Sequence, residues 1–160
     1  MAIDTHIKFD GVDGESTRQD HKNWIEVLSW SWDISNSAAM TGGSSGRGKG
    51  RATAGALNFM HTYDKASPTL AKRCADGKHF EKVEMVSRKS GEGQKEFLTI
   101  TLKDVFITSV APSGSSGGDI AEAISMTYGQ IDFSYKPQDG KGAVGAPVLF
   151  GLNVETGKIT

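Results

Sequence analysis

Residues 95–110 read KEFLTITLKDVFITSV, and after the loop APSGSSGG residues 119–135 read DIAEAISMTYGQIDFSY. Two runs rich in β-branched and aromatic residues on either side of a Gly/Ser loop are typical of a long β-hairpin. In the first run the apolar residues change to the other face of the strand at Asp104, and in the second they change at Gly129. Such strands must bulge or bend, so the pattern predicts a curved hairpin.

The same change of face recurs in two further runs and predicts the fold class. Asn23–Ser35 changes face at Val27–Leu28, and Arg51–Tyr63 changes face near its middle. Strands that each meet two apolar surfaces are expected in a closed or nearly closed barrel. Further strand patterns cover residues 3–9, 80–88 and 147–154. The sequence therefore predicts a mainly β protein, an antiparallel β-barrel of two packed curved sheets.

One short α-helix, at about Ser67–Asp76, is expected to flank the barrel. Ser67 is a suitable N-cap, Pro68 stands at the first helical position, and Gly77 suits the C-terminal cap. Cys74 falls on the apolar face, where it is expected to be a small buried residue. A helix of under three turns is not stable alone, so we expect it to dock on the barrel.

Composition and charge set the broad class of the protein. The chain has 160 residues, a formal net charge of −1 and a single cysteine, so no intrachain disulfide is expected. Lys and Arg are scattered, which argues against nucleic-acid binding. No apolar run is long enough to insert in a membrane, and the N-terminal residues lack the pattern of a secretory signal. We expect one domain spanning residues 1–160.

The motifs that carry chemistry are weak, so we expect no catalytic residue, no metal and no cofactor. The sequence G-x-S-x-G occurs at residues 42–46 and 114–118, but without the strand–turn–helix context of a serine nucleophile. The segment GSSGRGKG, residues 43–50, lacks the Ser or Thr of a phosphate-binding loop. The histidines have no zinc-ligand spacing. His6 is expected to be solvated, and His61 to pack in the barrel. The polar segment Ser16–Lys22 is expected to be an exposed loop.

Four residues on the strands have two possible interpretations. Trp30 and Trp32 point to the same side, and barrel core is favoured over an exposed platform. The alternative is a monomeric β-barrel binding module that stacks a small ligand on these two rings. Glu122 and Asp104 are charges on apolar faces, which bulges or cross-strand pairing to Lys or Arg would explain better than an acid of altered pKa.

Residues 36–50, NSAAMTGGSSGRGKG, form a Gly-rich segment between two strand patterns. A segment of this composition buries little apolar surface, so it is expected to be a flexible loop in the isolated chain. It is also long for a connection inside a compact domain, and long loops are often functional.

Six segments together resemble the hemolysin-coregulated protein (Hcp) family, whose members form the inner tube of the bacterial type VI secretion machine. The segments are FDGVDGES (9–16), IEVLSWSWDIS (25–35), YDKASPTLAKRCADGKHF (63–80), VEMVSRKSG (83–91), LTITLKDVFITSV (98–110) and EAISMTYGQIDFSY (122–135). The resemblance runs in order from Ile3 to about Leu152. It implies a hexameric ring of β-barrels with a wide channel, and rings that stack into a tube.

The resemblance also implies partners and a destination. Partners would be further copies of the chain, the sheath and spike proteins of the machine, and small effector proteins carried in the ring lumen. The chain would be cytoplasmic before assembly and then secreted without a signal peptide. No C-terminal toxin domain follows the last strand, so a plain tube subunit is expected.

Two groups of contact residues follow from the same resemblance. The Gly-rich loop of the family reaches a neighbouring subunit, which assigns the subunit interface or ring stacking to Ser37, Met40, Arg47 and Lys49. The loop of the central hairpin would supply ring or lumen contacts through Ser115, Ser116 and Asp119.

Overall fold

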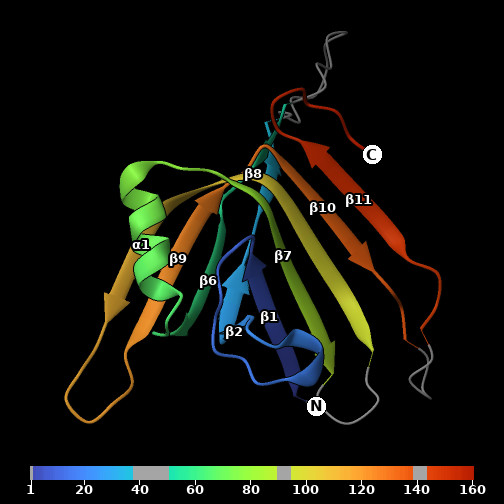
Figure 1. Ribbon diagram of the computed structural model, residues 1–160. Coiled ribbons are helices and arrows are strands. Elements are labelled where there is room, and N and C mark those ends of the chain that lie inside the picture. Colours follow the sequence, from blue (N-terminus) through green and yellow to red (C-terminus); the bar gives the residue numbers. More distant parts are fainter. Residues whose placement is uncertain (1, 38–50, 90–94, 139–143) are drawn as a thin grey trace, which may run out of the picture.

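The computed structural model describes residues 2–37, 51–89, 95–138 and 144–160. This part of the chain is mainly β with one α-helix, as the sequence predicted (Figure 1). The strands are β1 (Ile3–Phe9), β2 (Ile25–Val27), β3 (Ser29–Ser31), β4 (Ile34–Asn36), β5 (Ala52–Ala54), β6 (Leu57–Thr62), β7 (Phe80–Lys89), β8 (Glu96–Ser113), β9 (Ala121–Thr127), β10 (Gln130–Tyr135) and β11 (Val148–Asn153). The helices are the short 3-10 helix η1 (Gln19–His21) and α1 (Ser67–Asp76).

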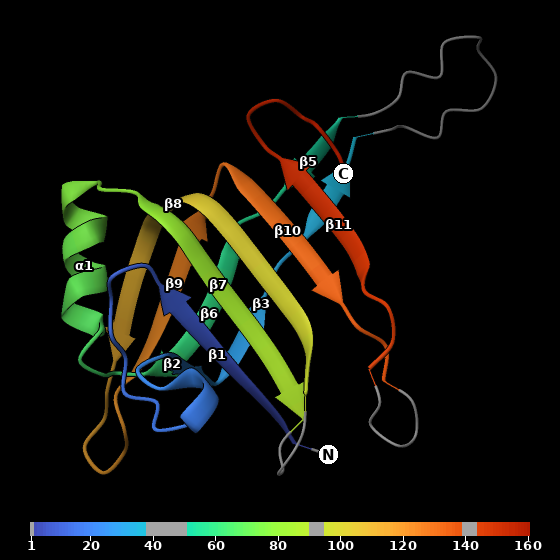
Figure 2. The same cartoon turned by 45° about the vertical axis from the view of Figure 1, so that its right-hand side comes forward.

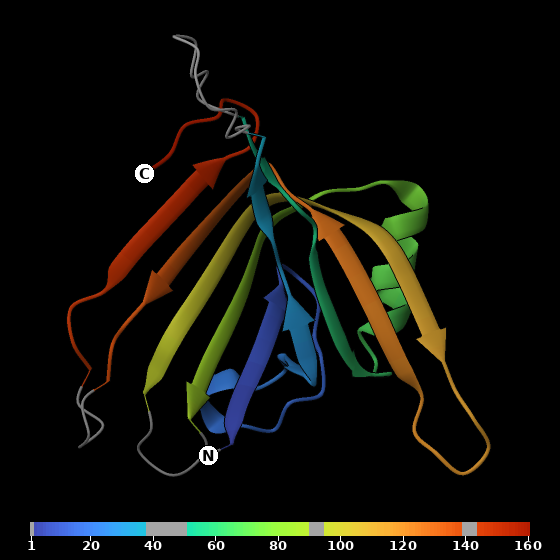
Figure 3. The same cartoon turned by 180° about the vertical axis from the view of Figure 1, so that it is seen from behind.

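Strand β8 joins two antiparallel sheets. The hydrogen-bonded order is β2-β1-β7-β8-β9-β6-β3, and β10 pairs with both β8 and β11. The first half of β8 pairs with β7 and β10, and its second half pairs with β9. Seen from behind, the two sheets diverge from a common upper region, with β10 and β11 on one side and β9 with α1 on the other (Figure 3). The predicted long hairpin is therefore present, with its second strand divided into β9 and β10.

Strands β9 and β10 are separated near Gly129, and β8 bends at Asp104; these are the two positions where the sequence predicted a change of apolar face. Asp104 has a φ of 53°, and the Gly129 amide donates to the carbonyls of Lys103 at 2.9 Å and Asp104 at 3.2 Å. Before this point Leu102 is buried, and after it Val105 is buried on the other face of the strand. A residue in the left-handed region bends the strand, so each half of β8 presents its apolar side to the core.

The mainly β class is confirmed, and of the two predicted forms, closed or nearly closed, the hydrogen-bonded ladder of the described strands does not form the closed ring. Strands β10 and β11 extend one sheet past β8 rather than continuing around the core. The two ends of the path, β2 and β3, are consecutive pieces of one segment. They meet at Leu28, whose amide donates to the Met60 carbonyl at 2.8 Å.

Two predicted long strands are broken because their pieces pair with different partners. Asn23–Ser35 becomes β2 on β1, β3 on β6 and β4 on β5. Arg51–Tyr63 becomes β5 and β6, separated at Gly55. The Gly55 amide donates to the Asp33 carbonyl at 2.8 Å, and a Cβ at position 55 would collide with the Asp33 carboxylate. The β4–β5 ribbon extends away from both sheets (Figure 2).

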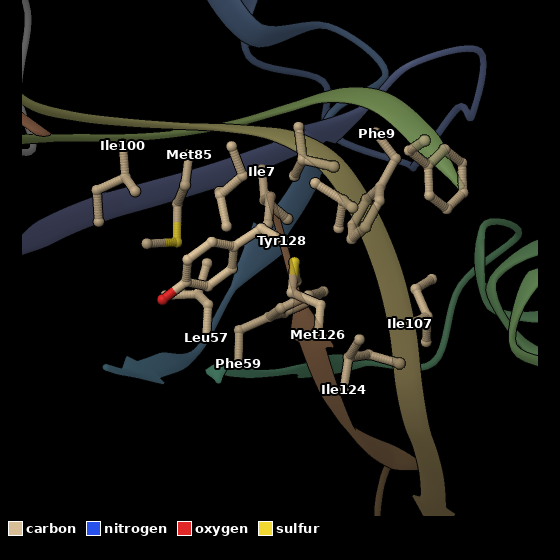
Figure 4. Close-up of a cluster of buried hydrophobic side chains, with 14 of the residues drawn as sticks. Ile7, Phe9, Leu57, Phe59, Met85, Ile100, Ile107, Ile124, Met126 and Tyr128 are labelled. Atoms are coloured by element: carbon tan, nitrogen blue, oxygen red, sulfur yellow. The ribbon is translucent and has the colours of Figure 1, made fainter. Parts of the chain in front are cut away.

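The core fills the space between the two sheets (Figure 4). Phe9 is its aromatic centre, with ring centroids 5.1 Å from Phe80 and 6.0 Å from Phe59. Both sheets contribute fully buried side chains, among them Ile7, Leu57, Met85, Ile100, Leu102, Ile107, Ile124 and Met126. Each such side chain contributes about 1.5–3 kcal/mol relative to exposure, so this cluster sets the relative position of the sheets.

Helix α1 has the predicted bounds but a different N-terminal cap. The N-cap is Ala66, and Ser67 is the first helical residue. The Ser67 Oγ accepts a hydrogen bond from the Asp64 amide at 3.1 Å, so it serves the preceding turn instead of the helix. Gly77, with a φ of 71°, is the predicted left-handed C-cap, and its amide donates to the Arg73 carbonyl at 3.0 Å. Cys74 is half-buried and packs against the core.

Candidate assembly surfaces

The β4–β5 ribbon is the first candidate surface. Among the described strands, these two strands of three residues each pair only with each other. At its described end the Ser37 amide donates to the Arg51 carbonyl at 3.2 Å, and the Ser37 Oγ accepts from the Arg51 amide at 3.0 Å. Ser37 is therefore engaged within the ribbon. The other residues assigned to this surface, Met40, Arg47 and Lys49, lie outside the described residues.

A groove of about 990 Å³ separates this ribbon from the chain that follows β11. One wall is formed by residues 51–54 and the other by residues 152–157 and Ile159. The second wall is fixed to β11, because the Asn153 amide donates to the Lys158 carbonyl and the Gly151 amide to the Thr160 carbonyl, both at 2.9 Å. The groove has both apolar side chains and backbone groups, which suits an extended peptide segment.

The tip of the β8–β9 hairpin is the second candidate surface. Ser115, Ser116 and Asp119 are all exposed there. Gly117 has a φ of 98°, and the Gly118 amide donates to the Ser115 carbonyl at 3.3 Å, which closes the turn. This tip lies at the end of the molecule opposite to the β4–β5 ribbon (Figure 2). The structure therefore does not bring the two groups of assigned residues together.

Strand β11 carries an apolar surface that the sequence pattern did not indicate. Val148 and Leu149 are 64% and 68% exposed, whereas Phe150 packs partly against the core and Leu152 is buried. They lie at the start of β11, before the part of that strand that bonds to residues 158–160. Successive residues of a strand point to opposite faces, so these two side chains expose apolar area on both faces of β11. In the sequence, this exposed apolar area could have been recognised from Leu149, an apolar residue on the face of the strand opposite to Val148 and Phe150.

The tryptophan pair belongs to the packing of the core. Trp30 and Trp32 are half-buried and lie against the hydrophobic cluster. The Trp32 Nε1 donates to the Tyr128 hydroxyl at 2.5 Å, and that hydroxyl donates to the Gly55 carbonyl at 2.7 Å. Burial raises the pKa of the Tyr128 hydroxyl, which remains a donor. These contacts favour the core interpretation over a ligand-stacking platform.

A buried ion pair links β6 to β9. His61 is 0% and Glu122 is 1% exposed, and His61 Nε2 lies 2.8 Å from Glu122 Oε1. Glu122 thus pairs with a histidine rather than with the expected Lys or Arg. Burial alone would lower the pKa of His61, but the nearby Asp64 and Glu122 outweigh burial and raise that pKa. Glu122 is the direct partner, because Asp64 Oδ2 lies 3.8 Å from His61 Nδ1 and acts through its charge.

His6 and residues 16–22 correct two expectations. His6 is 3% exposed rather than solvated, because a loop from residues 16–24 covers it. That loop was expected to be exposed, yet it contains η1 and buries Ser16 and His21. No group of three or more His, Cys, Asp or Glu residues able to hold a metal occurs among the described residues, and none of their helices is long and apolar enough to cross a membrane.

Comparisons with known proteins agree on one family. The family model described as "Type VI secretion system effector, Hcp" matches residues 6–135. Protein hcp1 from Pseudomonas aeruginosa is 40% identical over 157 residues, which cover 96% of each chain. A solved structure described as a type six secretion system protein has a TM-score of 0.94 and 33% identity, covering 99% of this chain and 100% of its own. Hcp1 from Salmonella typhimurium has a TM-score of 0.82 and 34% identity over the whole of both chains.

Proposed function

The chain belongs to the Hcp family of type VI secretion proteins, and from that membership we propose that it forms hexameric rings that stack into the inner tube of the secretion machine. The sheath and spike proteins of that machine would be its partners. The subunit would be cytoplasmic before assembly and secreted without a signal peptide, and the ring lumen would hold small effector proteins. We propose a structural role rather than catalysis.

The β4–β5 ribbon is the observation that carries this proposal. A two-stranded ribbon is at best marginally stable when it stands alone in water. Here the ribbon extends away from both sheets, and Ile34 remains 43% exposed on it (Figure 2). A neighbouring subunit that packs against the ribbon would supply the missing contacts. Ser37 and the three interface residues beyond it in the Gly-rich loop would then act between subunits.

The remaining surfaces suit a repeated contact between copies. Val148 and Leu149 offer apolar area on β11, while Ser115, Ser116 and Asp119 offer polar groups at the other end of the molecule. A contact between two different surfaces closes into a ring when the rotation allows it, and stacked rings make a filament. The formal net charge of −1 limits repulsion between subunits.

Native mass spectrometry and electron microscopy of the purified chain test the proposal. We expect a species of six times the 17.1 kDa chain mass, seen as rings with a central hole. Leu149→Lys should raise the dissociation constant of the ring about tenfold or more, because it places a charge in a desolvated contact. Thr127→Lys, on an exposed position of β9, is the matched control. A strict monomer at high concentration would refute the ring.

A further inference from the structure

Three rings, of His6, His21 and Trp24, pack together on the side of β1 that faces away from the core. His6 alternates with the core residues Ile7 and Phe9, so it points to the opposite face of the sheet. The ring of His21 lies parallel to it, with centroids 5.0 Å apart and planes at 8°. Trp24 packs edge-on against His21 at 4.7 Å. We call residues 16–24, which contribute His21 and Trp24, the strap.

The strap covers a small buried layer that is separate from the main core. Val86 and Arg88 of β7 are 2% and 8% exposed, yet neither belongs to the main hydrophobic cluster. Val86 is paired with His6 across the β1–β7 ladder. Three polar contacts tie the strap to the sheet. Arg88 Nη1 donates to Asp20 Oδ2 at 2.6 Å, Arg18 Nη2 donates to Asp4 Oδ2 of β1 at 2.7 Å, and His21 Nε2 lies 2.8 Å from Glu96 Oε1 on β8. Figure 2 shows the strap against the lower end of the β1–β7 pair.

The charges around the stacked histidines balance only one added proton. Two of the three carboxylates in these contacts are bonded to guanidinium groups, since Asp4 accepts from Arg18 at 2.7 Å and Asp20 accepts from Arg88. The third, Glu96, faces His21. Glu26 of β2 lies opposite His6 in the β1–β2 ladder, but it is exposed to solvent. In the buried contacts no carboxylate therefore remains to balance an imidazolium at His6. Within the described part of the chain the Nδ1 atoms of both His6 and His21 are also buried without a hydrogen-bond partner.

Electrostatics thus disfavours a proton on His6 while the strap is docked. Burial lowers the pKa of His6 most, followed by the proximity of His21, with smaller contributions in the same direction from Arg88 and Arg18. Asp4 opposes the change only in part, and the pKa of His6 falls to about 4. Once the strap is released, His6 regains the ordinary histidine pKa of about 6.5 and binds a proton more tightly.

We propose that the strap is an acid-sensitive latch, docked while His6 is neutral beside His21 and released when His6 takes up a proton. Release uncovers Val86 and separates Arg88 from Asp20. Arg88 also lines a groove of about 580 Å³, together with Lys95, Lys136, Asp20 and Glu96. Asp20 belongs to the strap and would leave with it. Acid would therefore leave three basic groups and Glu96 in this groove, a net positive surface, while both sheets stay folded. This inference does not depend on the ring proposed above.

Hydrogen–deuterium exchange of the full chain at pH 7 and at about pH 4.5, corrected for intrinsic exchange rates, tests the latch. Because the released state binds the extra proton, the opening equilibrium rises as pH falls below the ordinary pKa. From the pKa of His6 we expect protection of the strap to fall roughly 50-fold. Protection of β9 should not fall over this range, because the His61–Glu122 pair is stabilised at low pH, so β9 is the internal reference for global unfolding. Equal protection of the strap at both pH values would overturn the proposal.

Three variants distinguish opening of the strap from unfolding of the whole chain at low pH. His6→Phe keeps a ring for His21 to stack on and removes the charge, so the strap should stay protected at about pH 4.5. Glu96→Gln removes the partner of His21 and should move opening to higher pH. His79→Gln changes an exposed histidine outside the stack and should behave as the parent chain. Opening of His6→Phe over the same pH range as the parent would count against the latch.

The parent chain gives an independent readout if His6→Phe does not fold. A nuclear magnetic resonance titration of the His6 ring should then give a pKa below about 5 in the folded chain. A value at or above the ordinary histidine pKa would overturn the proposal, because the docked strap would then not oppose the proton.

Discussion

At the scale of single residues, the buried pair of Glu122 and His61 should make the free energy of unfolding depend on pH. Because the pKa of His61 is raised in the folded state, its contribution to stability is complete below the unfolded pKa and is lost as pH rises through the folded pKa. Glu122→Gln removes one of the two carboxylates that favour the proton on His61 and leaves Asp64. We expect it to lower the free energy of unfolding by about 1.5–3 kcal/mol at pH 6, and by less at pH 9, as measured by urea denaturation. An equal loss of unfolding free energy at pH 6 and pH 9 would contradict the pairing of Glu122 with a protonated His61.

Alternation along a strand predicted which residues face the core, but not which segment covers the other face. His61 and Trp32 were predicted to pack inside, and both do. His6 was predicted to be solvated because it alternates with Ile7, yet residues from a polar loop bury it. The pairing of Glu122 with His61 follows from the β6–β9 register, which strand patterns alone do not specify.

The bend of β8 at Asp104 gives a prediction at the scale of one element. Asp104 holds a left-handed φ of 53°, which Asp tolerates better than a β-branched residue does. Asp104→Val should therefore lower the free energy of unfolding by about 1–2 kcal/mol, measured by urea denaturation. Thr127→Val, at an exposed position of β9 next to the bend, should change it by less than about 0.5 kcal/mol. Equal effects of the two variants would show that the bend does not depend on residue 104.

Changes of apolar face predicted the bends in the strands, while pairing decided where the strands break. The changes at Asp104 and Gly129 mark a bend in β8 and the boundary between β9 and β10. At Val27–Leu28 the same signal marks the passage from one sheet to the other. The separate β4–β5 ribbon was not predicted, because its residues continue the patterns of β3 and β6. Gly55, where a side chain would collide with Asp33, was the clearest available sign of a break.

For the whole molecule, motifs quoted from most of the chain predicted the family, and the matches to the family model and to solved Hcp structures confirm it. The same motifs gave the mainly β class, because they contain most of the strands. The open arrangement of the sheets was not predictable from them. It depends on β10 and β11 continuing past β8, which is a property of pairing between distant segments. The exposed Val148 and Leu149 follow from that arrangement.

Shortening the Gly-rich loop tests whether the loop serves the stability of its own subunit or the assembly of several subunits. The ribbon that bears the loop pairs only with itself, so replacing residues 38–50 by a tight turn leaves both sheets and their core in place. Loop length alone has a small effect, about 0.6 kcal/mol for each doubling, so urea unfolding should change little. Ring stacking should be lost in electron micrographs, because the proposed contacts of Met40, Arg47 and Lys49 are gone.

A loop of the same length and composition with its residues in a different order is the control. It keeps the length of the connection between the two strands and changes only the positions of the loop side chains. Normal stacking by the shortened chain would show that the loop has no part in assembly, whereas a large loss of stability would show that it supports the fold of its own subunit.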